Sequence, residues 1–408
     1  MRILQLTPRL PYPPDEGGRI GIFNLTKYLS FREHKITLLS LTANQVENIQ
    51  VDIQKLRKWC DVEVVYKNTK TKLWGLLLNL FLRIPYIISK YHSRKVKDAI
   101  REILSKEKFD IVHIDSLHMA YCGRFINHEF SLPIVLREHN VETTVMERFY
   151  KNQKSLFIKL YAYLQWKKLR RYEAKTCEVF DKCFMTTKED EERIRKMNPG
   201  VKSCIIPVGV DLSYFYPLKI KEEPFSLIFV GSMKWLPNID GVLWFYNEVL
   251  PRIKEIFSEV KFYIVGHEPP MEVKELEKRD KNIIVTGFVE DVRPYVAKSS
   301  LYVVPLRIGG GMRLKILEAM AMEKPVVSTL IGAEGVEAAN GKDIIIAANG
   351  ENFAERIIKL LKNKDYRKRI GKNGRKLVEE KYKWESILEK LEEKYVEVVR
   401  RRKERCKP

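Results

Sequence analysis

The chain has 408 residues, 45% of them hydrophobic, which is enough to bury the cores of two domains of about 200 residues each. Its formal net charge of +21 at pH 7 lies mainly in residues 1–205, which hold 37 Lys and Arg against 23 Asp and Glu. This excess suits nucleic acid, an anionic membrane surface or the charged surface of a heat-stable protein, and charge alone does not separate them. The six cysteines form no C-x-x-C pair, which argues against a zinc site and a disulfide framework and favours a reducing cytoplasm. The N-terminus lacks the long apolar region of a signal peptide.

Short apolar runs rich in Val and Ile alternate with helical patterns along the chain. The first half has expected strands at 3–6, 36–41, 62–65, 111–114, 134–136, 183–186 and 204–206. The second half repeats the plan at 227–230, 262–265, 283–285, 301–304, 326–328 and 344–346. Strands that alternate with helices indicate parallel sheets covered on both faces. We therefore predict an α/β protein with two doubly wound, Rossmann-like domains.

Residues 207–224 are rich in Pro and lack helical periodicity, which predicts a linker between domains at 1–206 and 225–385. From about Tyr366 onward the pattern is charged and helical, without a strand. Its last part, 386–408, is expected to form a separate C-terminal helix.

Polar residues follow the expected strands of the first half. A Pro-rich loop, 8–14, leads to Gly17 and Gly18, and an amphipathic helix is expected from Arg19. No G-x-G-x-x-G and no Walker lysine loop occur here, which argues against a dehydrogenase or an NTPase. A simple turn into a helix is the plain alternative. Asp115 and His139 each follow an apolar strand and are expected at the rim where such sheets bind ligands.

The same strand exit carries Glu138, which would either orient His139 or face solvent.

Further along, residues 146–175 hold nine Lys and Arg, two acids and seven aromatics, and an apolar run occupies 73–82. Core packing is one interpretation of both stretches. The other is an interfacial surface, since cations interleaved with Trp and Tyr suit an anionic headgroup layer, or single-stranded nucleic acid.

Three strand ends of the second half are rich in Gly and polar residues. Ser232, Lys234 and Asn238 follow the first strand, and Gly266 with His267 follows the second. Gly287, Phe288 and Val289 follow the third. All lie where ligands of doubly wound sheets bind, although Lys234 is as easily a solvated surface residue and His267 is more typical of one.

The most informative segment is LYVVPLRIGGGMRLKILEAMA, residues 301–321. It predicts a strand, a glycine loop through Gly309, Gly310, Gly311 and Met312, and a helix. Backbone N–H groups at such a helix start favour an anion, and Arg313 and Lys315 add two cations. Glu318, expected in the first helical turn, either caps the helix or accepts from the two hydroxyls of a nucleotide ribose.

This segment resembles the donor site of the retaining, metal-independent glycosyltransferases of family 4, which have the two-domain GT-B architecture. The resemblance implies that Glu318 binds the ribose and that the glycine loop, Arg313 and Lys315 hold the diphosphate. It further implies that the two domains face a cleft, that the first binds the acceptor and the second the nucleotide sugar, and that the last helix crosses back to the first domain. One departure is that Gly310 stands where the family usually has another Glu, which contacts the sugar. Backbone amides of Gly309 to Gly311 are the expected replacement.

The resemblance also assigns Gly17 and Gly18 to the donor phosphates and Gly287, Phe288 and Val289 to the base, through backbone groups. Asp115 and His139 would contact the transferred sugar or the acceptor. Ser232, Lys234, Asn238 and Gly266 remain donor-site candidates at strand ends.

The sequence thus predicts a metal-independent hexosyltransferase that uses a nucleotide diphosphate sugar without a cofactor, on a glycan or lipid-linked acceptor. It is expected in the cytoplasm, peripheral at the inner face of the cell membrane, and not on nucleic acid. Retention by same-face internal return or through a covalent intermediate stays open. The alternatives are a GT-B-like sugar-nucleotide epimerase and a basic nucleic-acid-binding protein.

Overall fold

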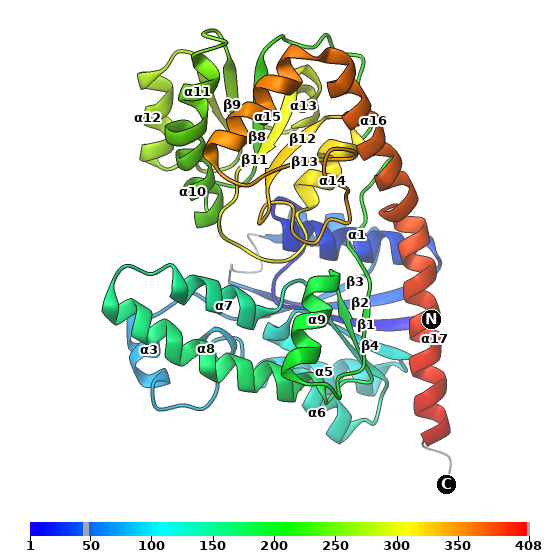
Figure 1. Ribbon diagram of the computed structural model, residues 1–408. Helices are drawn as coiled ribbons and strands as arrows, with labels where there is room; N and C mark the ends of the chain where they lie inside the picture. The colour runs from blue at the N-terminus through cyan, green and yellow to red at the C-terminus, as the bar shows by residue number, and fades with distance from the viewer. Residues whose placement is uncertain (44–48, 406–408) are drawn as a thin grey trace. The chain divides into compact units, whose positions relative to one another are not determined.

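The computed structural model describes residues 1–43 and 49–405, and its contacts divide the chain into two compact units. The first is Met1–Pro207 together with the chain from Ile387 onward, and the second is Val208–Ser386. Each unit is a parallel sheet flanked by helices (Figure 1), so the predicted α/β class with two doubly wound domains is confirmed. Residues 406–408 of the predicted C-terminal helix, among them Cys406, lie outside the described residues.

Seven parallel strands form the first sheet in the order β3-β2-β1-β4-β5-β6-β7. They are β1 (Arg2–Thr7), β2 (Lys35–Thr42), β3 (Asp61–Tyr66), β4 (Ile111–Asp115), β5 (Ile134–Glu138), β6 (Lys182–Met185) and β7 (Ser203–Ile205). Every residue of β4 and β5 is buried, as expected for strands covered on both faces. The strand order reverses between β1 and β4, and in such sheets ligands bind outside the carboxyl ends at this point.

The helices of this unit connect the strands. They are α1 (Gly17–Phe31), α2 (Gln50–Leu56), α3 (Leu73–Asn79), α4 (Tyr86–Ser89), α5 (Arg94–Lys106), η2 (Leu117–Met119), α6 (Tyr121–Glu129), α7 (Glu142–Lys151), α8 (Leu156–Cys177) and α9 (Lys188–Met197). Helix α1 begins at Gly17 and not at Arg19, so both predicted glycines lie in its first turn.

The second sheet has the order β10-β9-β8-β11-β12-β13, with its reversal between β8 and β11. Its strands are β8 (Ser226–Val230), β9 (Lys261–Val265), β10 (Ile283–Gly287), β11 (Leu301–Val304), β12 (Val326–Thr329) and β13 (Ile345–Ala347). Its helices are α10 (Leu236–Trp244), η3 (Phe245–Val249), α11 (Leu250–Lys254), α12 (Met271–Arg279), α13 (Arg293–Lys298), α14 (Leu314–Ala321), α15 (Gly350–Lys362) and α16 (Lys364–Lys381). All thirteen predicted strands are present in the two sheets.

The segment expected as a linker, 207–224, packs on the second unit. Val210 pairs with Lys383, and the Arg293 guanidinium lies 3.7 Å from the centroid of the Tyr214 ring. A Cβ on Gly209 would come within 2.7 Å of the Trp384 indole, so the close approach of this backbone requires glycine.

Helix α17 (Trp384–Arg405) ends the described chain, and from Ile387 it belongs to the first unit. Tyr395 anchors it there, because its hydroxyl lies 2.6 Å from His113 Nδ1 on β4, and Glu392 accepts hydrogen bonds from Arg32. None of the described helices is long and apolar enough to span a bilayer.

Candidate active site

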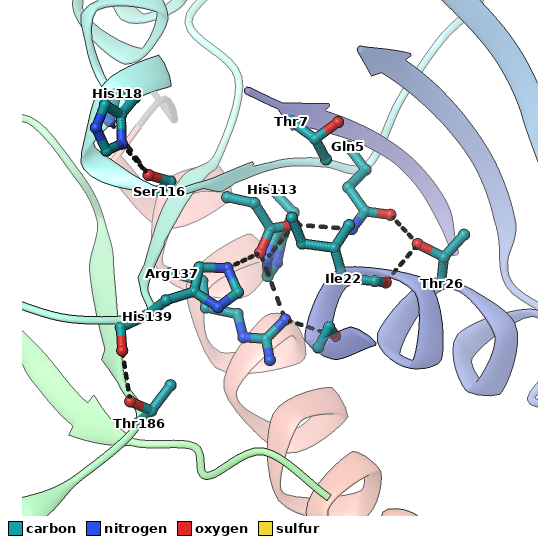
Figure 2. Close-up of polar contacts among 12 residues, drawn as sticks. Gln5, Thr7, Ile22, Thr26, His113, Ser116, His118, Arg137, His139 and Thr186 are labelled. Carbon is teal, nitrogen blue, oxygen red and sulfur yellow. Dashed lines mark hydrogen bonds and ion pairs between the residues drawn. The ribbon is translucent and has the colours of Figure 1, made fainter. Parts of the chain in front are cut away.

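A buried polar network lies at the carboxyl end of the first sheet (Figure 2). Sheet register places Gln5 on β1 beside His113 on β4, and Asp115 beside Arg137 on β5. Asp115 is the centre, because Gln5 Nε2 donates to its Oδ2 at 2.8 Å and Arg137 Nη1 lies 3.4 Å from its Oδ1. His139 Nε2 lies 3.3 Å from the same Oδ1.

The structure corrects the position predicted for Asp115. Its side chain is fully buried and not at the rim, so it cannot touch a substrate in this conformation. Burial works to raise the pKa of Asp115, but His113, His139 and Arg137 together hold it well below its usual value. Asp115 is therefore ionised near neutral pH.

His139 is the partly exposed member of the network, with 16% of its side chain accessible. Burial lowers the pKa of His139 even though Asp115 opposes the shift, so the ring is neutral near pH 7. A carboxylate can only accept, which makes Nε2 the protonated nitrogen and leaves Nδ1 as the acceptor.

Neither alternative for Glu138 was right, because it is buried and turned toward Cys177 of α8. The Cys177 thiol donates to Glu138 Oε1 at 3.6 Å. Burial, followed by the neighbouring Cys177 and Glu173, raises the pKa of Glu138 well above its usual value. Glu138 is thus a core group whose buried surroundings favour its protonated form.

The sequence did not single out His113, Arg137, Ser116 and His118. Ser116 has φ of +75°, and its Oγ lies 2.6 Å from His118 Nδ1 at the end of β4. For His113 and Arg137 the available signal was a polar residue inside an otherwise apolar strand, as in IVHID and IVLRE. Gly17 and Gly18 show open space where a Cβ would stand, so packing does not require glycine at either position.

In the second unit, β11 leads through the predicted glycine loop into α14. Gly309 has φ of +131° and Gly311 of +72°, conformations that favour glycine. Arg313, which is only 5% exposed, precedes the helix, and its Nη1 donates to the Gly310 carbonyl at 2.5 Å. A Cβ on Gly309 would collide with the Arg313 guanidinium, so this loop is shaped around that cation. Met312 is half-buried within it.

Lys315 reaches across to the first helix of the same unit. Its Nζ donates to Asn238 Oδ1 at 3.1 Å, and Asn238 Nδ2 donates to the Ser232 carbonyl at 2.7 Å. A Cβ on Gly231, which directly follows β8, would stand 2.5 Å from Lys315 Nζ. The ends of β8 and β11 thus converge on one ammonium group, as their adjacent places in the sheet require.

Glu318 lies in the second turn of α14, so the prediction of a first-turn position is wrong, and no side chain caps this helix. Burial raises the pKa of Glu318 to about 7 against the opposing effect of Lys315. Burial, followed by the charge of Arg313, lowers the pKa of Lys315 to about 7 while Glu318 opposes the shift. Two basic side chains and a carboxyl group therefore share a half-buried site. Burial there favours the neutral forms of both Lys315 and Glu318.

The remaining donor candidates are spread over the ends of three neighbouring strands, β8, β9 and β10. Lys234 Nζ lies 2.9 Å from Glu268 Oε1, and both side chains are half exposed. Lys234 is therefore the solvated surface residue that the sequence left open as an alternative. Gly266 N donates to the Gly287 carbonyl at 3.1 Å, and Gly287 has φ of +69°. Phe288 is 65% exposed and lies edge-on to the His267 ring, and Val289 follows it in the loop after β10.

A sheet end that carries two basic side chains, a carboxyl group and a glycine loop is chemically suited to an anionic ligand with hydroxyl groups. Sequence comparison identifies the class. Residues 16–214 match the model for Glycosyltransferase Family 4, and residues 224–363 match that for Glycosyl transferases group 1. The chain belongs to these glycosyltransferases and has the GT-B fold.

Individual relatives are distant. The chain is 24% identical to an uncharacterised 44.6 kDa protein in the cps region of Klebsiella pneumoniae over 96% of this chain and 98% of the relative. It is 30% identical to the capsular polysaccharide biosynthesis glycosyltransferase CapM of Staphylococcus aureus over 36% of this chain and 42% of the relative.

Solved structures share the fold at low identity. Sucrose-phosphate synthase from Thermosynechococcus elongatus has a TM-score of 0.74 at 15% identity, covering 98% of this chain and 99% of its own. Anabaena HepE in complex with UDP and glucose has a TM-score of 0.68 at 13% identity, covering 97% of this chain and all of its own.

Proposed function

We propose that this glycosyltransferase moves a hexose from a nucleoside diphosphate sugar to an acceptor hydroxyl with retention at the anomeric carbon. The observation that carries the proposal is the arrangement of Arg313, Lys315 and Glu318 around the glycine loop before α14. Cations and helix N–H groups suit a diphosphate, and a carboxylate suits the paired hydroxyls of a ribose. The UDP held by the Anabaena neighbour has both groups.

The chemistry needs stabilisation of a leaving group. Negative charge grows on the diphosphate as the sugar departs, and Lys315 and Arg313 stand in a partly desolvated site where such stabilisation is large. Because a bound diphosphate would favour the charged ammonium, it would raise the pKa of Lys315 from about 7. These residues would carry the charge that a divalent ion carries in other enzymes, so the reaction is proposed to need neither a metal nor a cofactor. Within 1–43 and 49–405, no three His, Cys, Asp or Glu side chains gather as a metal site.

His139 is the proposed contact to the transferred sugar or the acceptor. With Nε2 held by Asp115, its Nδ1 is available to accept from a hydroxyl. Asp115 would act through His139 and Arg137 without touching the substrate.

The acceptor is proposed to be a lipid-linked or cell-envelope glycan, and the enzyme to lie at the inner face of the membrane. Large apolar side chains are exposed on α3, in the turn that follows it and on the first half of α8, including Trp74 at 77%, Phe81 at 90% and Phe157 at 86%. Figure 1 shows α3 beside this part of α8, and Gln165 Nε2 of α8 donates to Asn79 Oδ1 of α3 at 3.0 Å. Apolar residues flanked by cations suit an anionic bilayer surface better than nucleic acid, which would stack on aromatics without needing exposed leucines.

A thermal-shift screen against nucleotide sugars and nucleotides tests the donor site, since ligand at about 100 times its Kd should add roughly 2.7 kcal/mol. Product analysis by NMR then reads the anomeric configuration, and inversion would contradict retention. Release of nucleoside diphosphate only when an acceptor is added supports the transferase over the epimerase. Salt-sensitive affinity for RNA, with no response to any nucleotide sugar, would favour the nucleic-acid alternative.

A further inference from the structure

A groove of about 1230 Å³ opens on the first unit between α8, α6, the start of α5 and residues 80–84. It exceeds the roughly 300–1000 Å³ of ordinary small-molecule pockets. No member of the network around Asp115 and His139 lines it, so it is separate from the candidate active site.

Basic side chains dominate the polar lining of the groove. Helix α8 contributes Lys168, Arg171 and Lys175, whose spacing of three and four residues puts them on one face. Arg124 of α6, Lys97 of α5 and Arg83 add three more, and the lining contains no Asp or Glu. Among the residues that the structure describes, no carboxylate lies within ion-pair distance of any of these six cations. Like charges facing one hollow repel, and an anion would relieve that repulsion.

One edge of the groove is apolar and fixed in place. Leu80, Phe81 and Leu82 line it with exposed fractions of 39%, 90% and 53%. Lys168 Nζ holds this edge against α8, because it donates to the Asn79 carbonyl at 2.6 Å and to the Leu80 carbonyl at 3.1 Å. Cations therefore stand directly beside exposed hydrocarbon.

His92, at the other side of the groove, has a buried Nε2 with no hydrogen-bond partner among the described residues. Burial, followed by Lys97 and Lys67, lowers the pKa of His92, so the ring is neutral near pH 7. It packs on the Tyr121 ring with centroids 4.3 Å apart. In the tautomer that carries its proton on Nε2, this nitrogen needs an acceptor, and a phosphate oxygen among these cations would supply one.

We propose that this groove binds the phosphate-bearing headgroup of an anionic phospholipid, with its acyl chains against Leu80 to Leu82. The proposal rests on the membrane association proposed above and specifies the ligand that provides it, while the donor site of the second unit is not involved. The groove would fix how the first unit meets the bilayer surface, whereas scattered surface cations would only attract it.

The test is co-sedimentation with vesicles of phosphatidylcholine alone or mixed with phosphatidylglycerol, at about 0.1 M salt. The groove variant carries Arg124→Gln, Arg171→Gln and Lys175→Gln, all exposed positions. The matched control carries Lys188→Gln, Lys196→Gln and Lys202→Gln, which remove the same charge from the surface of the same unit. Wild-type protein should bind only the anionic vesicles, and the groove variant should bind about a hundredfold less tightly, since each basic residue contributes about a fivefold factor near such a surface.

The control variant should keep most of the affinity, and Phe81→Ser with Leu82→Ser should lose it while folding normally, since both side chains are exposed. Equal losses in the two triple variants would overturn the groove as the site. Stabilisation of the protein by glycerol 1-phosphate, without vesicle binding, would assign a soluble phosphate to the groove and overturn the lipid proposal. UDP binding, measured without lipid, tests the transferase proposal separately, so either proposal can fail alone.

Discussion

Replacing Glu318 with Gln should stabilise the protein while it weakens nucleotide binding. Folding raises the pKa of Glu318 from 4.5 to about 7, which means that the folded state holds this proton more tightly than the unfolded state. Stability contributed by the protonated form is therefore complete below about pH 4.5 and is lost as the pH rises to 7. At about 1.4 kcal/mol per pK unit, the loss reaches about 3 kcal/mol.

The amide side chain of the Glu318→Gln variant would not titrate and would escape this loss. Removal of the carboxylate also takes a favourable charge from Lys315, and partial exposure screens the effect, so we expect a net gain of about 1–2 kcal/mol at pH 8 and little gain at pH 5. Differential scanning fluorimetry at both pH values measures it. A shift of a few degrees at pH 8 is expected, because 1 kcal/mol moves Tm by about 2–4 °C in a domain of this size.

Calorimetry with UDP measures the other half of the prediction. Loss of a charge-assisted contact to the ribose costs about 1.5–3 kcal/mol, or roughly 10- to 150-fold in Kd. Glu355→Gln, at an exposed position of the same unit, is the matched control and should change neither quantity. A destabilised Glu318→Gln variant with unchanged UDP affinity would refute the reasoning and make Glu318 a structural residue.

The double variant Arg313→Gln, Lys315→Gln should lower kcat more than donor affinity, because the charge that these residues face grows in the transition state. EDTA should leave the rate of the wild-type enzyme unchanged. Inactivation by EDTA that a divalent ion reverses would contradict the metal-independent mechanism. Affinity for inorganic pyrophosphate, measured by calorimetry, should fall between about pH 6 and about pH 8 as Lys315, with a pKa of about 7, loses its proton. A flat profile would separate Lys315 from the phosphates. Asp115→Asn should destabilise the first unit by about 3–5 kcal/mol in denaturant titrations, because it leaves the Arg137 charge buried without its partner, and should leave UDP affinity unchanged. A loss below about 1 kcal/mol would show that Arg137 is satisfied in another way.

The sequence predicted most of the fold. Runs such as those in β4, β8 and β11 are apolar throughout most of their length because both faces of a parallel sheet are covered, and this signal needs no tertiary information. The ends of helices were less accessible. Helix α1 includes Gly17 and Gly18, and α14 begins one residue before Lys315, which moves Glu318 out of the first turn. Helix starts depend on caps and on the loop before them, which residue patterns specify only within a few residues.

The donor-site prediction depended on residues close together in the chain. Gly309 to Glu318 span one turn and one helix, so their proximity follows from local geometry alone, although their roles in catalysis remain proposals. The contact between Lys315 and Asn238 joins residues 77 positions apart and follows from the adjacent places of β8 and β11 in the sheet.

What the sequence by itself determined was therefore the two-domain α/β class and the local character of the strand ends, because hydrophobic periodicity and turn composition are local properties. Tertiary structure alone decided which polar residues are buried. Asp115 was expected at the rim, and it lies instead beneath His139 with Gln5 and Arg137, which reach it from neighbouring strands. It also decided which cations lack a counter-charge, since those of α8, α6 and α5 meet in one groove only when the helices pack. Both outcomes depend on contacts between residues far apart in the chain, and a single sequence does not specify those contacts residue by residue.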